Sequence, residues 1–192
     1  YFNSADQLEQ LLEMGMEEGL QAAMGQIDDV LADLASFAAG RSTEAQILSD
    51  TQVRVSRVIR GSVDQVWEAH HDPALLARWQ LGPDGWTMPV CELAASVGDT
   101  YRVEWENEES GDRFGFTGEV LEQHAPYREV STESQIGMEG PGVVNEMTLT
   151  PVSGGTLLAY LITYPDAELR DIVLGTGMVD GMEASYLRLE SE

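Results

Sequence analysis

The chain has 192 residues, of which 34 are acidic and 10 basic, giving a formal net charge of −24 at pH 7. All the basic residues are arginine, which excludes a lysine Schiff base, a pyridoxal phosphate enzyme and a P-loop lysine. So acidic a chain repels phosphate backbones, which argues against nucleic-acid binding. No apolar run reaches the roughly 18 residues that span a bilayer. Cys91 is the only cysteine, which excludes an intrachain disulfide and favours a cytoplasmic protein.

The first stretch predicts an amphipathic helix over residues 1–38. Ser4 and Gln7 fit a capping box at its start. Apolar residues then recur at steps of three and four, at Leu8, Leu11, Leu12, Met16, Leu20, Met24, Ile27, Leu31 and Leu34. Such a stripe gains free energy when it is buried. We therefore expect segment 5–35 to pack on the following domain or to pair with a second copy, giving a homodimer.

This first helix is similar to the end of the chain. The run Gly15-Met16-Glu17-Glu18-Gly19-Leu20 matches Gly177-Met178-Val179-Asp180-Gly181-Met182 in one register. We interpret residues 1–38 as resembling the C-terminal helix of a preceding, truncated copy of the domain. Residues 39–50 are polar and contain Gly and Ser, as is typical of a linker. A tandem of two similar domains fits better than a solenoid, because only one end of the unit recurs.

Residues 51–192 predict one complete α+β domain. Val53 and Val55 alternate with polar residues, which indicates a strand, and Ser62 can cap the first of two short helices. Strand-like runs follow at about 86–94, 99–106, 113–122, 127–135, 143–150 and 156–164. A final helix is expected over 166–190. Consecutive strands with hairpin-length gaps favour an antiparallel sheet, here curved around the last helix.

Three runs in this part resemble a known family: Leu81-Gly82-Pro83-Asp84-Gly85-Trp86, Val97-Gly98-Asp99-Thr100-Tyr101-Arg102, and Gly177-Met178 with Gly181-Met182. With Val66-Trp67-Glu68-Ala69 upstream, they are similar to the activator of heat-shock-protein-90 ATPase homologue group of the SRPBCC superfamily. The resemblance implies a START-like, helix-grip fold, in which a curved antiparallel sheet wraps around a long C-terminal helix. Such a fold implies an apolar cavity between sheet and helix.

Alternation selects the candidate cavity residues, because residues two apart on a strand and four apart on a helix share a face. The strand candidates are Tyr101, Val103, Trp105, Phe114, Phe116, Met147, Leu149, Leu158 and Tyr160. The helix candidates are Trp67, Met178, Met182 and Tyr186. Methionines and aromatics suit an adaptable apolar ligand site of roughly 300–1,000 Å³; the alternative is an ordinary filled core. We expect one buried region to unite Trp105, Phe116, Met147, Tyr160, Met178 and Met182.

The densest titratable cluster is His70-His71-Asp72. Adjacent helical side chains point about 100° apart, so the two histidines are poorly placed to share a metal. No metal, no cofactor and no catalytic residue is predicted. A general-base role is the alternative to a solvated helix end, which we expect here. Cys91 lies in an apolar strand pattern and is expected to be a buried small residue.

Three functions stay open from the sequence. The first is a non-catalytic binding domain for a hydrophobic small molecule or acyl chain in the cavity. The second is a chaperone-activator-like domain that interacts with a protein partner, as the family name suggests. The third is a cyclase- or hydrolase-like enzyme that uses the cavity as a reaction chamber. Polar groups pointing inward, above all Arg102, Glu104 or His70, would favour the enzyme.

Overall fold

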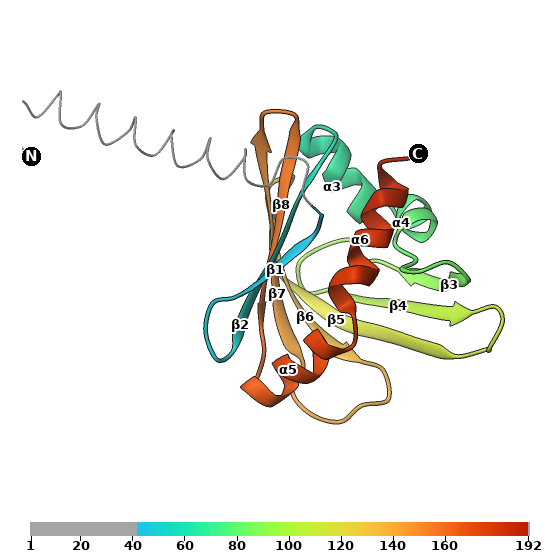
Figure 1. Cartoon of the computed structure of the whole chain (residues 1–192). Helices are drawn as coiled ribbons and strands as arrows, with labels where there is room; N and C mark the ends of the chain where they lie inside the picture. Colours follow the sequence, from blue (N-terminus) through green and yellow to red (C-terminus); the bar gives the residue numbers. More distant parts are fainter. Residues whose placement is uncertain (1–41, 192) are drawn as a thin grey trace, which may run out of the picture. The chain divides into compact units, whose positions relative to one another are not determined.

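The structure, a computed structural model, describes residues 42–191. The helix expected over residues 1–38, its similarity to a preceding domain and its role in a homodimer lie outside the described residues. The described elements are, in order, β1 (Glu44–Ile47), β2 (Gln52–Ile59), α3 (Val63–His71), α4 (Pro73–Trp79), β3 (Trp86–Glu92), β4 (Thr100–Asn107), β5 (Arg113–His124), β6 (Arg128–Gln135), β7 (Val143–Val152), β8 (Gly155–Thr163), α5 (Ala167–Gly175) and α6 (Met178–Leu189) (Figure 1).

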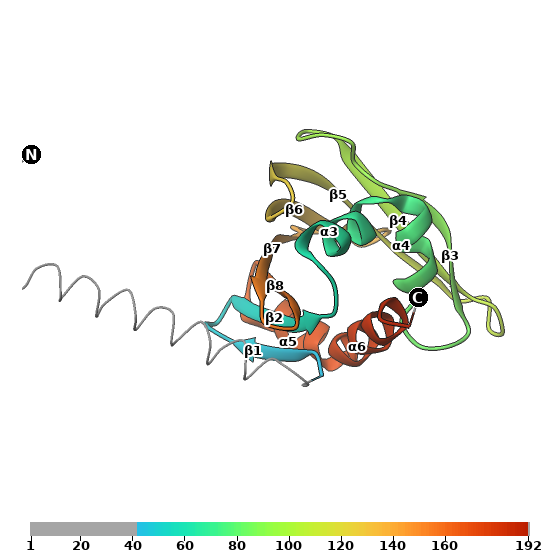
Figure 2. The same cartoon turned by 90° about the horizontal axis from the view of Figure 1, so that it is seen from above.

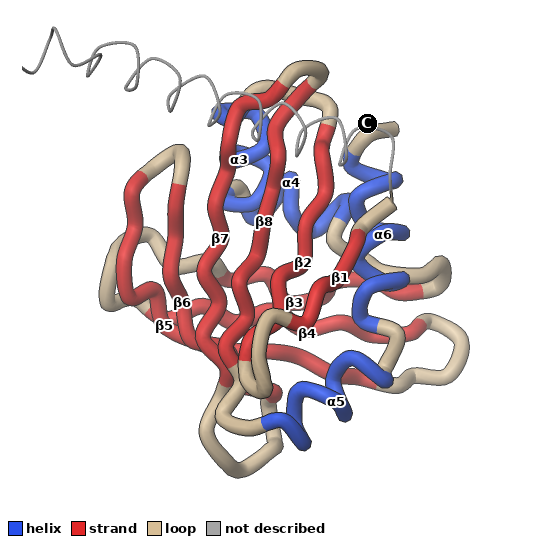
Figure 3. Tube along the Cα trace, turned by 60° about the vertical axis from the view of Figure 1, so that its left-hand side comes forward, coloured by secondary structure: helices blue, strands red, loops and turns tan. Residues whose placement is uncertain are grey.

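The described strands form one antiparallel sheet in the order β1-β2-β8-β7-β6-β5-β4-β3 (Figure 3). The sheet curves, so that α6 lies between its β1–β2 end and its β3–β4 end (Figure 2). The α+β, helix-grip class predicted from the sequence is therefore confirmed. None of the helices within residues 42–191 has the length and apolar composition needed to cross a bilayer.

An additional strand, β1, forms inside the stretch that the sequence indicated as linker 39–50. It pairs antiparallel with β2, with Ala45 opposite Val55. Without it, the backbone N–H and C=O groups along one side of β2 would form an open sheet edge. The four residues Glu-Ala-Gln-Ile are too few and too polar to produce a strand pattern, and their side chains are mostly exposed.

The helix expected over 166–190 is two helices. Asp166 caps α5, and its carboxylate accepts a hydrogen bond from the backbone N–H of Leu169. Gly177 lies between the helices with φ of +83°, in the left-handed region that glycine adopts without a Cβ penalty. The chain turns there, so α5 and α6 cover different parts of the sheet.

The two short helices after β2 follow one another directly, because the residue that ends α3 also caps α4. Ser62 and Gln65 form a capping box at the start of α3. Asp72 ends α3, and its carboxylate accepts hydrogen bonds from the backbone N–H groups of Ala74 and Leu75 in α4. The indole N–H of Trp79 then donates to the carbonyl oxygen of Ala69, 2.9 Å away. The last turn of α3 is thereby fixed against α4.

Gly118 of β5 lies where β6 approaches closely. A Cβ at this position would collide with the carbonyl oxygen of Thr132 on β6. Tyr101 is the cross-strand partner of Gly118, and its hydroxyl donates to the same Thr132 oxygen at 2.9 Å. The missing side chain thus allows the two strands to approach closely and allows the Tyr101 ring to reach across β5.

A buried cation holds α6 over the sheet. The side chain of Arg57 on β2 is 5% exposed and forms ion pairs with Glu183 and Glu190 of α6, the second at 2.9 Å. The same Glu183 oxygen accepts hydrogen bonds from the backbone N–H and the hydroxyl of Thr43, each at 2.7 Å. Glu190 also accepts from the backbone N–H of Arg60, at 3.0 Å. We call Arg57, Glu183 and Glu190 the arginine clamp.

The other side of α6 is tied to the loop between α4 and β3. The hydroxyl of Ser185 accepts a hydrogen bond from the backbone N–H of Gly82 at 2.8 Å. Arg188 donates to the carbonyl oxygens of Trp79 and Gly82 at 3.1 and 3.2 Å. Polar contacts therefore fix α6 from both sides.

The arginine clamp yields a stability prediction. Replacing Arg57 with Met leaves two glutamates without their cation, so we expect the free energy of unfolding to fall by about 3–5 kcal/mol, the usual cost of breaking a buried pair. Arg54→Met on the exposed face of the same strand is the matched control and should cost roughly 0.5 kcal/mol or less. Urea unfolding measures both. Equal losses in the two variants would contradict the clamp.

Candidate functional site

The sheet face turned towards α6, here called the inner face, is defined by strand register. Val55 of β2 lies opposite Tyr160 of β8, which lies opposite Met147 of β7. Met147 lies opposite Glu129 of β6. Every second residue of these strands therefore shares this face. On α6, Tyr186 belongs to the apolar cluster that contains Leu158 and Met147, and Met182 packs against this cluster.

The predicted cavity residues divide into two groups rather than one. Those on or against the core under α6 are Trp67, Met147, Leu149, Leu158, Tyr160, Met178, Met182 and Tyr186. Those at the far end of the inner face are Tyr101, Val103, Trp105, Phe114 and Phe116, on β4 and β5. Of the residues expected to share one buried region, Trp105 and Phe116 do not belong to the apolar clusters that contain or contact Met147, Tyr160, Met178 and Met182.

The second group contains an aromatic cluster. The rings of Trp105 and Phe114 stack at 5.0 Å, and Phe116 meets Trp105 edge-on at 5.9 Å. Trp86 of β3 adds a fourth ring, 5.1 Å from Phe114. Trp105 is buried and its indole N–H donates to the carbonyl oxygen of Gln80 at 2.6 Å, whereas Phe114 is 38% exposed. This end of the face is filled by its own side chains.

Between the two groups lies a set of polar residues that apolar periodicity did not reveal. Glu129, Ser131 and Glu133 occupy successive inner-face positions of β6, opposite Met147, Asn145 and Val143. We call these three residues the polar strip. Residues 128–135 read Arg-Glu-Val-Ser-Thr-Glu-Ser-Gln, so this predicted strand is polar on both faces. That composition, in the middle of a sheet, is the signal that could have found the strip.

One end of the polar strip is a histidine–carboxylate pair. The His71 Nε2 atom lies 2.9 Å from Glu129 Oε2, which also accepts a hydrogen bond from the amide of Gln123 at 2.9 Å. His71 Nδ1 donates to the Trp67 carbonyl oxygen at 2.8 Å, and the Trp67 and His71 rings stack at 3.8 Å. With Nδ1 already protonated, the bond between Nε2 and the carboxylate requires a second, shared proton.

The pKa of Glu129 reflects this pairing. Burial acts to raise the pKa, but the hydrogen bonds from His71 and Gln123 outweigh burial, so the pKa lies below its ordinary value. Glu129 is therefore ionised. Its Oε2 atom accepts the hydrogen bonds from both His71 and Gln123.

The other end of the strip is Glu133, which has a different environment. Burial raises the pKa of Glu133, although the side chains of Asn145 and Tyr101 act in the opposite direction. Because a carboxylate only accepts, the hydrogen bond from Asn145 uses its amide N–H. The Asn145 Oδ1 atom is then left buried without a partner among the described residues, as is the hydroxyl of Tyr164.

His70 contradicts the solvated helix end that we expected for the His-His-Asp cluster. Its Nδ1 donates to the Val66 carbonyl oxygen at 2.7 Å, and its ring contacts Trp79 edge-on at 4.8 Å. Its ring centroid lies 6.2 Å from that of Tyr186, and the residue is 8% exposed. Burial lowers the pKa of His70 to about 4, so the ring is neutral at pH 7.

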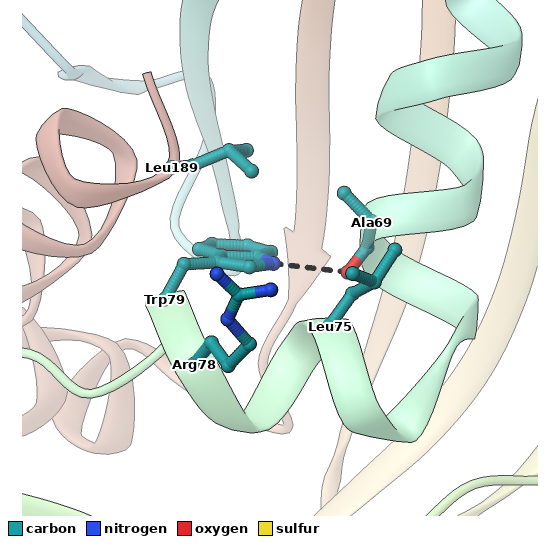
Figure 4. A pocket seen from close by; sticks show the side chains of 5 residues that line it. All are labelled: Ala69, Leu75, Arg78, Trp79 and Leu189. Atoms are coloured by element: carbon teal, nitrogen blue, oxygen red, sulfur yellow. Dashed lines mark hydrogen bonds between the residues drawn. The ribbon is translucent and has the colours of Figure 1, made fainter. Parts of the chain in front are cut away.

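A small pocket lies among α3, α4 and the end of α6. Ala69, Leu75, Arg78, Trp79 and Leu189 line it, and its volume is about 60 Å³ (Figure 4). None of the predicted cavity residues is among them. Its size is well below the roughly 300–1,000 Å³ of ordinary small-molecule sites. This pocket is not the candidate site.

Comparisons with known proteins identify the family. A family model described as Activator of Hsp90 ATPase homolog 1-like protein matches residues 60–192. The sequence matched none of the curated proteins.

Three solved structures illustrate the similarity. A protein from Rhodobacter sphaeroides is 30% identical over 79% of this chain and 97% of that chain, with a TM-score of 0.73. A protein from Chromobacterium violaceum is 28% identical over 73% and 95% of the two chains, with a TM-score of 0.61. DynU16, from the dynemicin biosynthetic locus, is 27% identical over 74% of this chain and 48% of that one, with a TM-score of 0.57.

The burial of His70 predicts a pH dependence of stability. Unfolded His70 gains a proton near pH 6.5, whereas the folded residue gains it only near pH 4, so stability is lost as the pH falls between these values. Between pH 7.5 and 5, wild type should lose about 2 kcal/mol more than His70→Gln in urea unfolding. His124→Gln, at an exposed histidine, is the control. A wild-type loss equal to that of His70→Gln would contradict the buried, neutral ring.

Proposed function

The chain belongs to the Activator of Hsp90 ATPase homolog 1-like protein family, and we propose that its described part is a non-catalytic binding domain for a hydrophobic small molecule or acyl chain. Family and fold together indicate a domain of the ligand-binding type. The proposed site is the inner face around the polar strip, opposite Met178 and Met182 of the last helix.

The observation that carries this proposal is the uneven burial of the inner face. Val53, Val55 and Leu158 at its β2–β8 end are at most 1% exposed, as in a filled core. Tyr101 and the polar strip remain half-buried, as do Met178 and Met182. A sheet that only needed a core would carry apolar side chains there, because burying carboxylates costs free energy. Polar groups set among apolar and aromatic ones are the composition of a ligand site.

The enzyme alternative depends on whether polar side chains with free catalytic atoms point towards the inner face. Both ring nitrogens of His71 are engaged, and the free nitrogen of His70 is buried in the core. Arg102 and Glu104 pair with each other on the opposite face from Tyr101 and Val103, and the Arg102 side chain is 52% exposed. Of the inward groups named from the sequence, only His70 is buried, and it has no access to a ligand. These placements favour binding over catalysis.

A fluorescent neutral dye tests the proposal. Nile red should bind the full chain with one-to-one stoichiometry and be displaced by decanol. Ser131→Leu adds apolar volume at the centre of the polar strip, so it should weaken dye binding about tenfold or more, a change of about 1.4 kcal/mol.

The matched control is Ser56→Leu, which makes the same change on the opposite face of β2 and should leave dye affinity at the wild-type value. Circular dichroism checks that both variants fold. Equal dye affinity in Ser131→Leu and wild type, or no displacement by decanol, would refute the inner-face site.

A further inference from the structure

Three polar side chains lie near the Glu133 end of the polar strip, on β6, on β7 and directly after β8. Glu133 of β6 lies opposite Val143 of β7, and Asn145 lies two residues farther along the same inner face. Tyr164 follows β8 directly, and burial, together with the nearby Glu133 carboxylate, raises the pKa of its hydroxyl. This hydroxyl and the Asn145 Oδ1 atom are both buried without a partner among the described residues, and Tyr164 is 3% exposed.

Unpaired buried polar atoms are costly, and each in a native structure calls for an explanation. Asn145 Oδ1 can only accept a hydrogen bond, and an ionised Glu133 carboxylate can only accept. The Tyr164 hydroxyl can donate as well as accept, but it is bonded to neither of these groups. A donor that reaches Asn145 Oδ1 and Glu133 is therefore what the site lacks. The amide N–H of Asn145 is already used on Glu133, and the hydroxyl of Tyr101 is used on the Thr132 carbonyl oxygen.

The same region lacks a cation. The chain has no lysine, and among the strands of residues 42–191 only Arg57 is an arginine at an inner-face position. That guanidinium is committed to the arginine clamp. His71 is bonded to Glu129 at the far end of the strip, roughly 13 Å along the strand from Glu133. Burial raises the pKa of Glu133, so its negative charge is disfavoured there without a compensating cation. A ligand cation supplies that compensation, whereas a ligand carboxylate adds a second uncompensated charge.

We propose that the bound molecule carries an ammonium group, which donates hydrogen bonds to Glu133 and to Asn145 Oδ1 while the apolar body lies along Tyr160, Met147 and Met182. An ammonium has three donors and no acceptor, which complements this set of acceptors. Hydrogen bonds between ionised groups are roughly twice as strong as those between neutral ones. The site thus selects apolar amines and rejects free fatty acids. This inference rests on the proposed function, since it assigns the polar end of that ligand.

Three ligands of equal length and different charge test the charge preference: decylamine, decanol and decanoate. Isothermal titration calorimetry of the full chain in 0.15 M salt, below the micellar concentrations, gives their affinities. We expect decylamine to bind at least tenfold more tightly than decanol, and decanoate to bind most weakly. This comparison uses the unmodified chain and does not depend on any variant.

Two variants then locate the preference. Glu133→Gln should lower the decylamine affinity to that of decanol. Glu108→Gln removes the same charge from the exposed β4–β5 hairpin and should keep the full preference for decylamine, which separates the site from attraction to the acidic surface.

Failure of this inference is distinguishable from failure of the proposed function. If decanol binds and decanoate binds as tightly as decylamine, the ammonium assignment is refuted while the apolar site stands. If decylamine is preferred equally by wild type and Glu133→Gln, the preference arises elsewhere and the assignment is also refuted. If neither decanol nor decylamine binds, both proposals fall.

Discussion

The arginine clamp is the interaction on which the arrangement of this domain depends. Arg57 is buried on β2, and its charge is compensated only because Glu183 and Glu190 of α6 reach it. Removing a cation from water is costly, so the pair must form with good geometry or the helix cannot occupy this place. With Ser185 and Arg188 tied to the loop at Gly82, α6 is fixed by polar contacts at both sides. The closest backbone neighbours of α6 are α4 and α5 rather than any strand.

The inner face beneath α6 is packed unevenly. The β2–β8 end of the inner face is packed by Val53, Val55 and Leu158, and the β3–β5 end is packed by its own aromatic rings. The polar strip lies between them, with one carboxylate bonded to His71 and the other, at Glu133, without a nearby cation. The two ends of the face thus provide apolar packing, and the polar middle is where we propose that a ligand binds.

The sequence predicted the fold class because alternation and turn residues are local signals, and strand register then placed Tyr101, Phe116, Met147 and Tyr160 on one face as expected. It missed β1, whose four residues form a strand only because β2 offers an edge. It missed the break at Gly177, since a glycine within an apolar helical pattern does not by itself end a helix. His70 and the polar strip were missed for another reason. Their partners, Trp79, Tyr186 and Asn145, are brought close only by the tertiary fold.

Methionine methyl signals offer the most direct test of the central claim, that a ligand binds the inner face beneath α6. Met147, Met178 and Met182 lie on this face or on the helices over it, whereas Met138 lies in the β6–β7 loop and is 63% exposed. With ¹³C-methyl methionine, titration with decanol should shift the signals of the first three with a common affinity and leave that of Met138 unchanged. Shifts confined to Met138, or to the three methionines within residues 1–41, with the inner-face signals unmoved, would contradict the account.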